Sequence, residues 1–372
     1  MRILAIETSC DETGVALVEG NKEERTLIFT TLKAVLLSQA MLHLPYGGVY
    51  PTLAKREHEK NLPMLFEQFN NESFDAVAVT HGPGLEPALW TGVEFAKKVA
   101  AERGVPLLAT NHMEGHLISS LARRESIKYQ VSNDKTHSSI LQNVRMTIKD
   151  VQLPILALLI SGGHTEFVLM KEWLRYEVIG KTLDDAVGEA FDKVARMLGL
   201  PYPGGPAISK IADTARSKSQ KTNIKLPRPM LNSGTCDFSF SGLKTAALYA
   251  LRGKNLTEDE KNAFAAELED AIAEVLVSKT RKALWDTGAK TFVIGGGVAA
   301  NRYIREQIEK MLLDEFPDVD LRLPALDITG DNAIMIAQAA LARALSGKNN
   351  AAGPDLRAVG NLSIASRNEP LF

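Results

Sequence analysis

Two histidines one helical turn apart are the sharpest chemical signal in this sequence. They are His112 and His116, in the segment His-Met-Glu-Gly-His. Residues i and i+4 lie on one face of an α-helix, so both imidazoles can bind a single metal ion. Zinc proteases with paired histidines need a glutamate directly after the first one, whereas here Glu114 stands two residues on and points to another face. The spacing therefore indicates a metal site and disfavours a protease; the alternative is a pair of ordinary helix-surface or capping histidines.

A third ligand has to come from a distant part of the chain, and a carboxylate is the expected donor. Asp331 is the best candidate, because it stands in a polar turn at the start of the alanine-rich helical segment Gly330–Leu345. Two imidazoles and one carboxylate leave coordination positions open, which suits Fe(II), Zn(II) or Mn(II). We expect one divalent metal ion per subunit.

Three glycine-rich turns could bring the backbone close to a phosphate. They are Ser161-Gly162-Gly163, Pro203–Pro206 and Gly295–Asn301, and the side chain of Asn301 could hydrogen-bond a ribose or a base. Neither the P-loop pattern nor the dinucleotide fingerprint is present. One turn of this kind is usually plain geometry, but three together favour nucleotide binding.

Acidic residues gather at two further places. Glu7, Asp11 and Glu12 crowd the tip of the first predicted hairpin, where they would repel a phosphate and favour a cation, an amine or a hydroxyl. The helical segment 184–193 is also rich in acids, and Asp192 is placed to face a cleft. The alternative for this second group is a solvated helix surface.

An internal repeat indicates how these residues are positioned. Ile3–Val18 aligns without a gap on Ile155–Met170, and six of sixteen positions are identical. Each copy consists of an apolar strand, a small polar turn and a second apolar strand, which predicts a β-hairpin. Chance similarity between two buried hairpins is the alternative, but the repeat favours two related lobes whose hairpin tips face one cleft.

The rest of the sequence predicts α/β lobes. Apolar strands at Asp75–Thr80 and Thr291–Ile294 end in glycine turns and are followed by helical patterns at 88–102 and 301–313. A long amphipathic helix is expected at 258–285, with Thr257 as its N-cap. The predicted domains are an N-terminal lobe at 1–122, an inserted basic loop at 123–151 and a C-terminal lobe at 152–372, whose end is free to return to the first lobe.

Composition excludes several classes of protein. The 372 residues carry 43 Lys and Arg against 45 Asp and Glu, so the chain does not coat nucleic acid through net charge. Cys10 and Cys236 are the only cysteines, which excludes a disulfide framework. Apolar stretches are far shorter than the roughly 20 residues of a membrane helix, so a soluble cytoplasmic protein is expected. Locally basic runs occur at 123–150 and 210–228, either as solvated loops or as phosphate contacts.

Ten collinear motifs resemble those of the bacterial TsaD-type tRNA threonylcarbamoyltransferase family. The resemblance covers nearly the whole chain and rests on Ile6–Thr13, Pro45–Gly48, His81–Leu85, His112–His116, Ser161–Thr165, Gly188–Lys193, Pro203–Pro206, Phe238–Lys244, Gly295–Asn301 and Asp331-Asn332. It implies the two-lobed fold shared by actin, Hsp70 and sugar kinases. It also implies transfer of threonylcarbamoyl from threonylcarbamoyl-AMP to N6 of adenosine 37 in ANN-decoding tRNAs, with release of AMP.

The resemblance also assigns residues and partners. The family's metal ligands fall on His112, His116 and Asp331, and Fe(II) is expected ahead of Zn(II) as the bound ion. The chemistry of the transfer, rather than the resemblance, suggests the hypothesis that Glu12 or Asp11 orients the incoming amine. A TsaB-type paralogue and a TsaE-type P-loop ATPase are the implied partners, and the tRNA is expected to contact the basic run 210–228. The family's adenylate contacts fall on Leu159, Ile160, Ser161, Gly162, Gly163, Asp192, Gly205 and Asn301.

One departure and two alternatives remain at this stage. The family is usually shorter between His116 and Ser161, so the segment 123–151 is expected to be an insertion of unknown role. The alternatives are a small-molecule kinase of the same fold and a non-catalytic nucleotide-binding subunit. Neither of these two functions requires the paired histidines.

Overall fold

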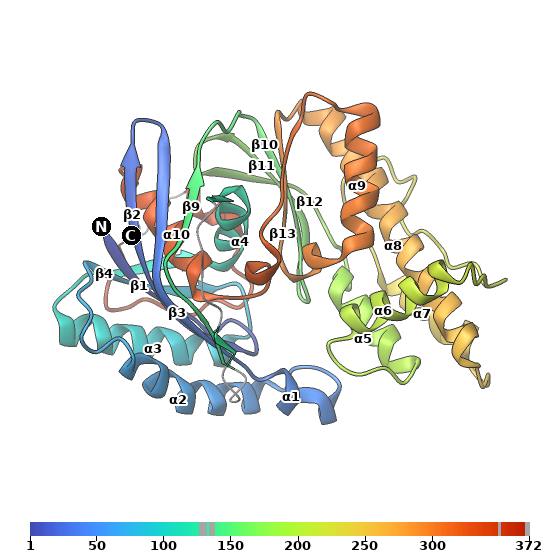
Figure 1. Ribbon diagram of the computed structural model, residues 1–372, viewed down its shortest axis with the longest axis horizontal. Helices are drawn as coiled ribbons and strands as arrows, with labels where there is room; N and C mark the ends of the chain where they lie inside the picture. The colour runs from blue at the N-terminus through green and yellow to red at the C-terminus, as the bar shows by residue number, and fades with distance from the viewer. Residues whose placement is uncertain (126–131, 134–137, 349–350, 369–372) are drawn as a thin grey trace.

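Two β-sheets alternate with three helical layers along the long axis of the molecule (Figure 1). The computed structural model describes residues 1–125, 132–133, 138–348 and 351–368. The first sheet is built mainly from the N-terminal third of the chain. Its strands are β1 (Arg2–Glu7), β2 (Glu12–Glu23), β3 (Thr26–Ser38), β4 (Ala76–Gly82), β5 (Leu107–Asn111), β6 (Arg123–Arg124), β7 (Ser132–Asn133), β8 (Ser138–Leu141) and β9 (Val144–Ile148).

The second sheet repeats the connectivity of the first. Its order, β14-β13-β10-β11-β12, corresponds to β5-β4-β1-β2-β3, with two antiparallel pairs and two parallel pairs in each. The strands are β10 (Ile155–Ile160), β11 (Thr165–Glu172), β12 (Arg175–Lys181), β13 (Thr291–Gly295) and β14 (Asp320–Arg322).

The hairpin repeat seen in the sequence is also a repeat in strand register. Ile3 pairs with Val18 in the first hairpin, and Ile155 pairs with Met170 in the second, so equivalent residues occupy equivalent positions. The prediction of a duplicated α/β fold of the actin-like, Hsp70-like and sugar-kinase-like class is confirmed.

The central helical layer lies between the sheets and consists of α4 (His112–Leu121) and α10 (Ala333–Leu345). All ten residues of α4 are buried, and α10 is buried along almost its whole length. The alanine-rich helix α10 is apolar on almost every side, which suits such an environment, whereas α4 also buries His112, Glu114 and His116. Although α10 follows the second sheet in the sequence, it packs against β1, β2 and β3 of the first. The exact lobe boundaries stay a prediction.

The outer faces of the two sheets are covered by amphipathic helices. The first sheet is covered by α2 (Pro51–Glu67) and α3 (Glu86–Arg103). The second is covered by α5 (Val187–Met197), α6 (Gly204–Ser217), α7 (Ser241–Leu251), α8 (Glu258–Thr287) and α9 (Arg302–Glu315). The predicted cap of α8 is present, because Thr257 and Glu260 form a reciprocal capping box. Short helices α1 (Ala40–His43) and η1 (Leu44–Tyr46) connect β3 to α2.

The expectation of a loop throughout 123–151 is wrong for its second half. There β9 pairs with residues 27–31 of β3, and β8 pairs with residues 34–37 of the same strand. Val144, Met146 and Ile148 alternate along β9 and are all buried. This period of two is a strand signal that the polar residues between them conceal. Residues 126–131 and 134–137 of the predicted loop lie outside the described part of the chain.

None of the helices in the described ranges has both the length and the apolar character needed to cross a membrane.

Candidate active site

The end of β5 positions the two histidines on α4. Asn111 is the N-cap of this helix, and its side-chain oxygen accepts hydrogen bonds from the backbone N–H groups of Met113 (2.9 Å) and Glu114 (3.2 Å). The helix therefore begins at His112, directly at the carboxyl end of a parallel strand. His116 follows one turn later on the same face, as predicted.

The side chains of His112, His116 and Asp331 converge on one point. The two Nε2 atoms are 3.1 Å apart, and Asp331 Oδ1 lies 3.3 Å from His112 Nε2 and 3.1 Å from His116 Nε2. Metal–nitrogen bonds of about 2.1 Å would separate neighbouring ligands by about 3.0 Å in an octahedral site and about 3.4 Å in a tetrahedral one. The observed triangle fits either geometry, and all three residues can offer one ligand atom to the same ion.

A buried carboxylate supports His112 from behind. Its Nδ1 lies 3.2 Å from Glu7 Oε2 and 3.1 Å from Ser9 Oγ. Glu7 also accepts hydrogen bonds from Thr80 Oγ1 (2.6 Å) and from the Ser9 backbone N–H (2.5 Å), and it is completely buried. Carboxylates in this position orient metal-binding histidines and fix their tautomer.

The sequence groups Glu7 with Asp11 and Glu12 at the first hairpin tip, whereas the structure buries Glu7 behind the His112 ring. Sequence reasoning missed its supporting role, although one signal was available. Glu7 ends the uninterrupted apolar strand β1, and a carboxylate inside such a run needs a buried partner.

The charges around the triad favour a protonated His112 ring beside an ionised Asp331 carboxylate. Burial opposes the charged form of His112, but the charges of Asp331 and Glu7 outweigh it and hold its pKa well above the ordinary value. Burial also opposes the charged form of Asp331, but His112 and His116 hold the pKa of this carboxyl well below its usual range. Burial lowers the pKa of His116. A divalent cation at this point would take the place of the proton on His112.

Glu114 points away from the triad. Its carboxylate accepts a hydrogen bond from Tyr176 Oη at 2.9 Å and pairs with Arg343 Nε at 2.6 Å, and all three residues are buried. The glutamate of the His-Met-Glu-Gly-His segment thus joins α4 to α10. It cannot activate a water at the histidines, which agrees with the argument against a protease.

The second hairpin tip lies near the triad, and its two glycines are accessible to solvent. Gly162 and Gly163 are exposed, and a Cβ added to either would meet nothing within 4 Å. The tip is closed by a hydrogen bond from the Ser161 backbone N–H to the His164 carbonyl at 2.8 Å. Burial and the nearby charges of His112 and His116 lower the pKa of His164 to about 4. Leu159 and Ile160 are completely buried in β10, so their side chains do not face this opening.

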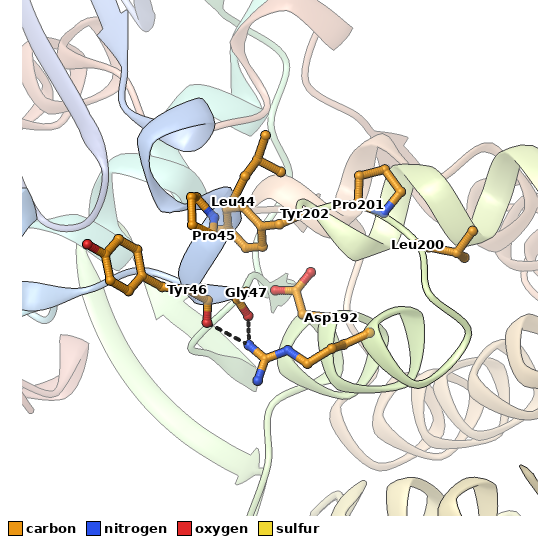
Figure 2. Close-up of a pocket in the computed structure, with 9 residues that line it drawn as sticks. Leu44, Pro45, Tyr46, Gly47, Asp192, Leu200, Pro201 and Tyr202 are labelled. Atoms are coloured by element: carbon orange, nitrogen blue, oxygen red, sulfur yellow. Dashed lines mark hydrogen bonds between the residues drawn. The ribbon is translucent and has the colours of Figure 1, made fainter. Parts of the chain in front are cut away.

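Asp192 lies in a cavity of about 320 Å³ between α5 and the loop that contains η1 (Figure 2). Its Oδ1 accepts a hydrogen bond of 2.7 Å from the Gly204 backbone N–H at the start of α6. Gly205 is open, because an added Cβ there would meet nothing within 4 Å. Burial raises the pKa of Asp192, and the charge of Asp11 contributes to that shift, so the first hairpin tip is close to the cavity.

Asp11 and Glu12 belong to the first hairpin tip, where β2 begins. Asp11 is 5% exposed, and Glu12 Oε1 lies 3.4 Å from Ser38 Oγ, which donates a weak hydrogen bond. Burial, Asp11 and Asp331 together raise the pKa of Glu12 well above its ordinary value. The charge of Glu12 therefore interacts with the candidate ligand Asp331, and the charge of Asp11 interacts with Glu12 and Asp192.

Asn301 has a structural role that its sequence context does not reveal. Its Nδ2 donates to Ser209 Oγ (2.8 Å) and Glu269 Oε1 (2.7 Å), while its Oδ1 accepts from the Ile304 N–H (2.9 Å) and caps α9. Both amide protons are thus used within the protein. A contact with a ribose or base stays a prediction and would use the remaining lone pair of Oδ1.

The acids of segment 184–193 serve mainly local structure. Asp184 accepts hydrogen bonds from Ser239, Phe240 and Ser241 at the start of α7, and although its burial acts in the opposite direction, these bonds lower its pKa to about 2. Asp185 pairs with Lys193 at 3.0 Å.

The basic run 210–228 is partly neutralised. Arg216 pairs with Glu269 and Asp270, and Arg228 pairs with Glu267 and Glu274. Four lysines are exposed and form no ion pair with a described residue: Lys210, Lys218, Lys221 and Lys225. A contact between this run and tRNA stays a prediction, and these lysines are its members without an ion-pair partner among the described residues.

Solved structures with this fold include HypF of T. kodakarensis. The likeness has a TM-score of 0.53 at 14% sequence identity and covers 94% of this chain. It covers 48% of HypF, so the chain spans about half the length of that protein, and at this identity the likeness concerns the fold alone.

Sequence relatives are much closer. A tRNA N6-adenosine threonylcarbamoyltransferase of Thermosipho africanus is 39% identical over 98% of this chain and 100% of the relative. A protein of the same name from Polynucleobacter necessarius is 42% identical over 94% of both chains. The family model TsaD, described as tRNA N6-adenosine threonylcarbamoyltransferase, matches residues 30–131 and 135–338. The chain therefore belongs to the tRNA N6-adenosine threonylcarbamoyltransferase family, and it is an enzyme of the transferase class.

Proposed function

We propose that this chain transfers a threonylcarbamoyl group from threonylcarbamoyl-AMP to N6 of adenosine 37 in ANN-decoding tRNAs. The observation that carries the proposal is the convergence of His112, His116 and Asp331 between the two hairpin tips, in a chain of this family. The products are the modified tRNA and AMP. The reaction is an acyl transfer, in which the N6 nitrogen forms a bond to the carbamoyl carbon while the bond from that carbon to the phosphate oxygen breaks.

The three ligands would hold one divalent ion, Fe(II) or Zn(II), which when bound supplies Lewis-acid stabilisation of oxygens in the threonylcarbamoyl group. The protein itself supplies the orientation of that group. Glu7 and Ser9 fix the His112 ring so that its Nε2 faces the site. Burial of His112 and His116 would limit the access of bulk water to the anhydride, which would otherwise hydrolyse.

The adenylate part of the donor would lie along the second hairpin tip and the start of α6. The exposed backbone at Gly162 and Gly163 can approach a phosphate without hindrance from a side chain. Gly205 leaves similar space, and Asp192 can accept a hydrogen bond from a ribose hydroxyl. These assignments are supported by open space at the glycines and by the cavity beside Asp192.

The first hairpin tip would receive the adenine amine. The N6 group is a weak nucleophile and must lose a proton as the new bond forms. Glu12 or Asp11 would orient this amine by accepting its hydrogen bonds. The raised pKa of Glu12, caused by burial together with Asp11 and Asp331, suits a carboxylate that accepts a proton during transfer. Transfer by Glu12→Ala at the wild-type rate would remove Glu12 from the mechanism.

The chain would act in the cytoplasm with partners. The tRNA would contact the exposed lysines of the basic run, and a TsaB-type paralogue and a TsaE-type ATPase would complete the assembly. A kinase of the same fold would have no use for two histidines and an aspartate on one ion. A non-catalytic subunit would equally have no need for this buried triad.

The deciding experiment combines threonylcarbamoyl-AMP, an unmodified ANN-decoding tRNA and the protein, with both partners supplied in one arm. Nucleoside mass spectrometry should detect threonylcarbamoyladenosine with the wild type and none with His116→Ala. Formation of no modified adenosine in either arm would reject the proposed reaction.

A further inference from the structure

Two tyrosines form an exposed stack at the edge of the cavity that contains Asp192. The ring centroids of Tyr46 and Tyr50 are 5.1 Å apart and the ring planes differ by 16°. Their exposed fractions are 55% and 50%, so about half of each residue remains in contact with solvent. Tyr46 is among the residues that line the cavity, and its ring extends from there away from Asp192 (Figure 2).

The stack stands on a backbone that is held in place from two sides. Arg196 of α5 donates hydrogen bonds from Nη2 to the carbonyl oxygens of Tyr46 and Gly47, as the dashed lines in Figure 2 show. Gly47 has a φ of +63°, and a Cβ there would collide with the Arg196 guanidinium. On the other side, the Tyr50 backbone N–H donates to His43 Nδ1 at 3.2 Å. The two rings are therefore presented at low entropic cost.

The helix that follows the stack carries exposed basic residues among acidic ones. Lys55 and Arg56 are exposed in the second turn of α2, the helix that begins directly after Tyr50. Arg56 forms no ion pair with any residue in the described ranges, and Lys55 makes only an exposed contact of 3.6 Å with Glu59. Exposed aromatic rings with cationic neighbours are the usual elements of a surface that binds single-stranded nucleic acid.

We propose that the Tyr46–Tyr50 stack binds an unpaired nucleobase of the RNA substrate, the one adjacent to the target adenosine. This inference rests on the proposed function. An enzyme that reacts with a base has to take it out of its stack, and the neighbouring base then loses one stacking partner. A tyrosine ring at the edge of the cavity replaces that partner, while Lys55 and Arg56 face the adjoining phosphates.

The test compares Tyr46→Ala and Tyr50→Ala with Tyr46→Phe and Tyr50→Phe, which keep the rings. Fluorescence anisotropy gives the Kd for an unmodified tRNA, and transfer assays give KM for tRNA and kcat separately. We expect each alanine variant to weaken tRNA binding roughly tenfold, with a similar rise in KM and little change in kcat. The phenylalanine variants should bind as the wild type does. Tyr249→Ala, at a 68% exposed tyrosine on α7, is the matched control and should change nothing.

A second substrate identifies the base. Two tRNAs are compared, one abasic on the 5′ side of the target adenosine and one abasic on the 3′ side. One of them should bind the wild type as weakly as the intact tRNA binds the alanine variants. On that tRNA the alanine substitutions should have no further effect. Unchanged binding by Tyr46→Ala and Tyr50→Ala, with transfer intact, would overturn the inference but leave the proposed function standing. The inference would also be overturned if the alanine variants lost binding to the TsaB-type partner while their tRNA affinity stayed unchanged. Absence of transfer by the wild type would instead reject the proposed function itself.

Discussion

At the scale of single residues, His112 is the centre of the site because its two ring nitrogens have different tasks. Nε2 faces His116 and Asp331, while Nδ1 faces Glu7 and Ser9. The ligands themselves could be predicted from sequence, since the spacing i, i+4 restricts where two imidazoles can meet. The need of Glu7 for a buried partner could be predicted, but the partner could not, because only the fold brings the end of β1 behind a helix that follows more than 100 residues later.

Glu7→Gln should weaken metal binding by about 10- to 100-fold while leaving all three ligands in place. The amide removes the negative charge that orients His112 and increases its basicity. The measurement is competition for the metal with a chelator of known affinity. Glu19→Gln, at an exposed glutamate on β2, is the matched control. Equal metal affinity of Glu7→Gln and the wild type would show that this carboxylate does not support the site.

Two other buried histidines predict a pH dependence of stability. His43 and His58 are joined through Gln39, and His58 Nε2 lies 3.0 Å from the Cys10 carbonyl at the first hairpin tip. Burial lowers the pKa of both imidazoles in the folded protein below the ordinary value of 6.5. At a pH between the folded-state pKa and 6.5, the unfolded chain therefore binds more protons than the folded one. Their contribution to stability is complete above pH 6.5 and declines as the pH falls toward the folded-state pKa.

The check is the midpoint of urea unfolding between pH 7.5 and pH 5, compared between the wild type and His58→Gln. The decline toward low pH should be shallower in the variant. An identical slope would mean that His58 does not contribute to it. The comparison between proteins is needed because His112 has a raised pKa and contributes with the opposite sign.

At the scale of elements, hairpins and glycine turns could be predicted, but sheet extensions could not. The repeat of Ile3–Val18 in Ile155–Met170 gave the correct pairing partners because one buried face fixes strand register. Strand β9 was missed because its alternating apolar residues stand among polar ones inside a segment without other strand signals. The structural role of Asn301 could not be predicted for a related reason, since its partners Ser209 and Glu269 lie on helices distant in sequence.

The pair of α4 and α10 depends on a buried ion pair. Removing Arg343 leaves Glu114 as an uncompensated charge in the core, so Arg343→Ala should reduce the free energy of unfolding by about 3–5 kcal/mol. Urea denaturation measures this loss. The double variant Glu114→Leu, Arg343→Met should regain most of it, because no buried charge remains. A loss below about 1 kcal/mol in the single variant would contradict the assignment.

At the scale of the whole molecule, the alternation of helices and sheets brings together ligands that are 215 residues apart in sequence. His116 lies on α4, and Asp331 precedes α10, and these two helices form the layer between the sheets. A metal ion would therefore connect the two helices on which both sheets pack. Its binding free energy would contribute to the stability of the entire fold.

Metal binding should accordingly stabilise the protein against unfolding by about 2.7 kcal/mol when the free metal reaches one hundred times its Kd. The measurement is urea unfolding with and without added Zn(II). Zn(II) is used because, unlike Fe(II), it is not oxidised by air during the experiment. Asp331→Asn should be insensitive to the metal over the same range. A full gain in the variant would place the ion elsewhere in the molecule.

The most direct test of the account is the rate of threonylcarbamoyl transfer to tRNA as a function of metal bound per chain. Protein stripped of metal is titrated with Fe(II) under anaerobic conditions, and modified adenosine is quantified at each step. The account predicts no transfer at the start and a linear rise that ends at one metal ion per chain. Full transfer by the stripped protein, or by His112→Ala, would contradict it.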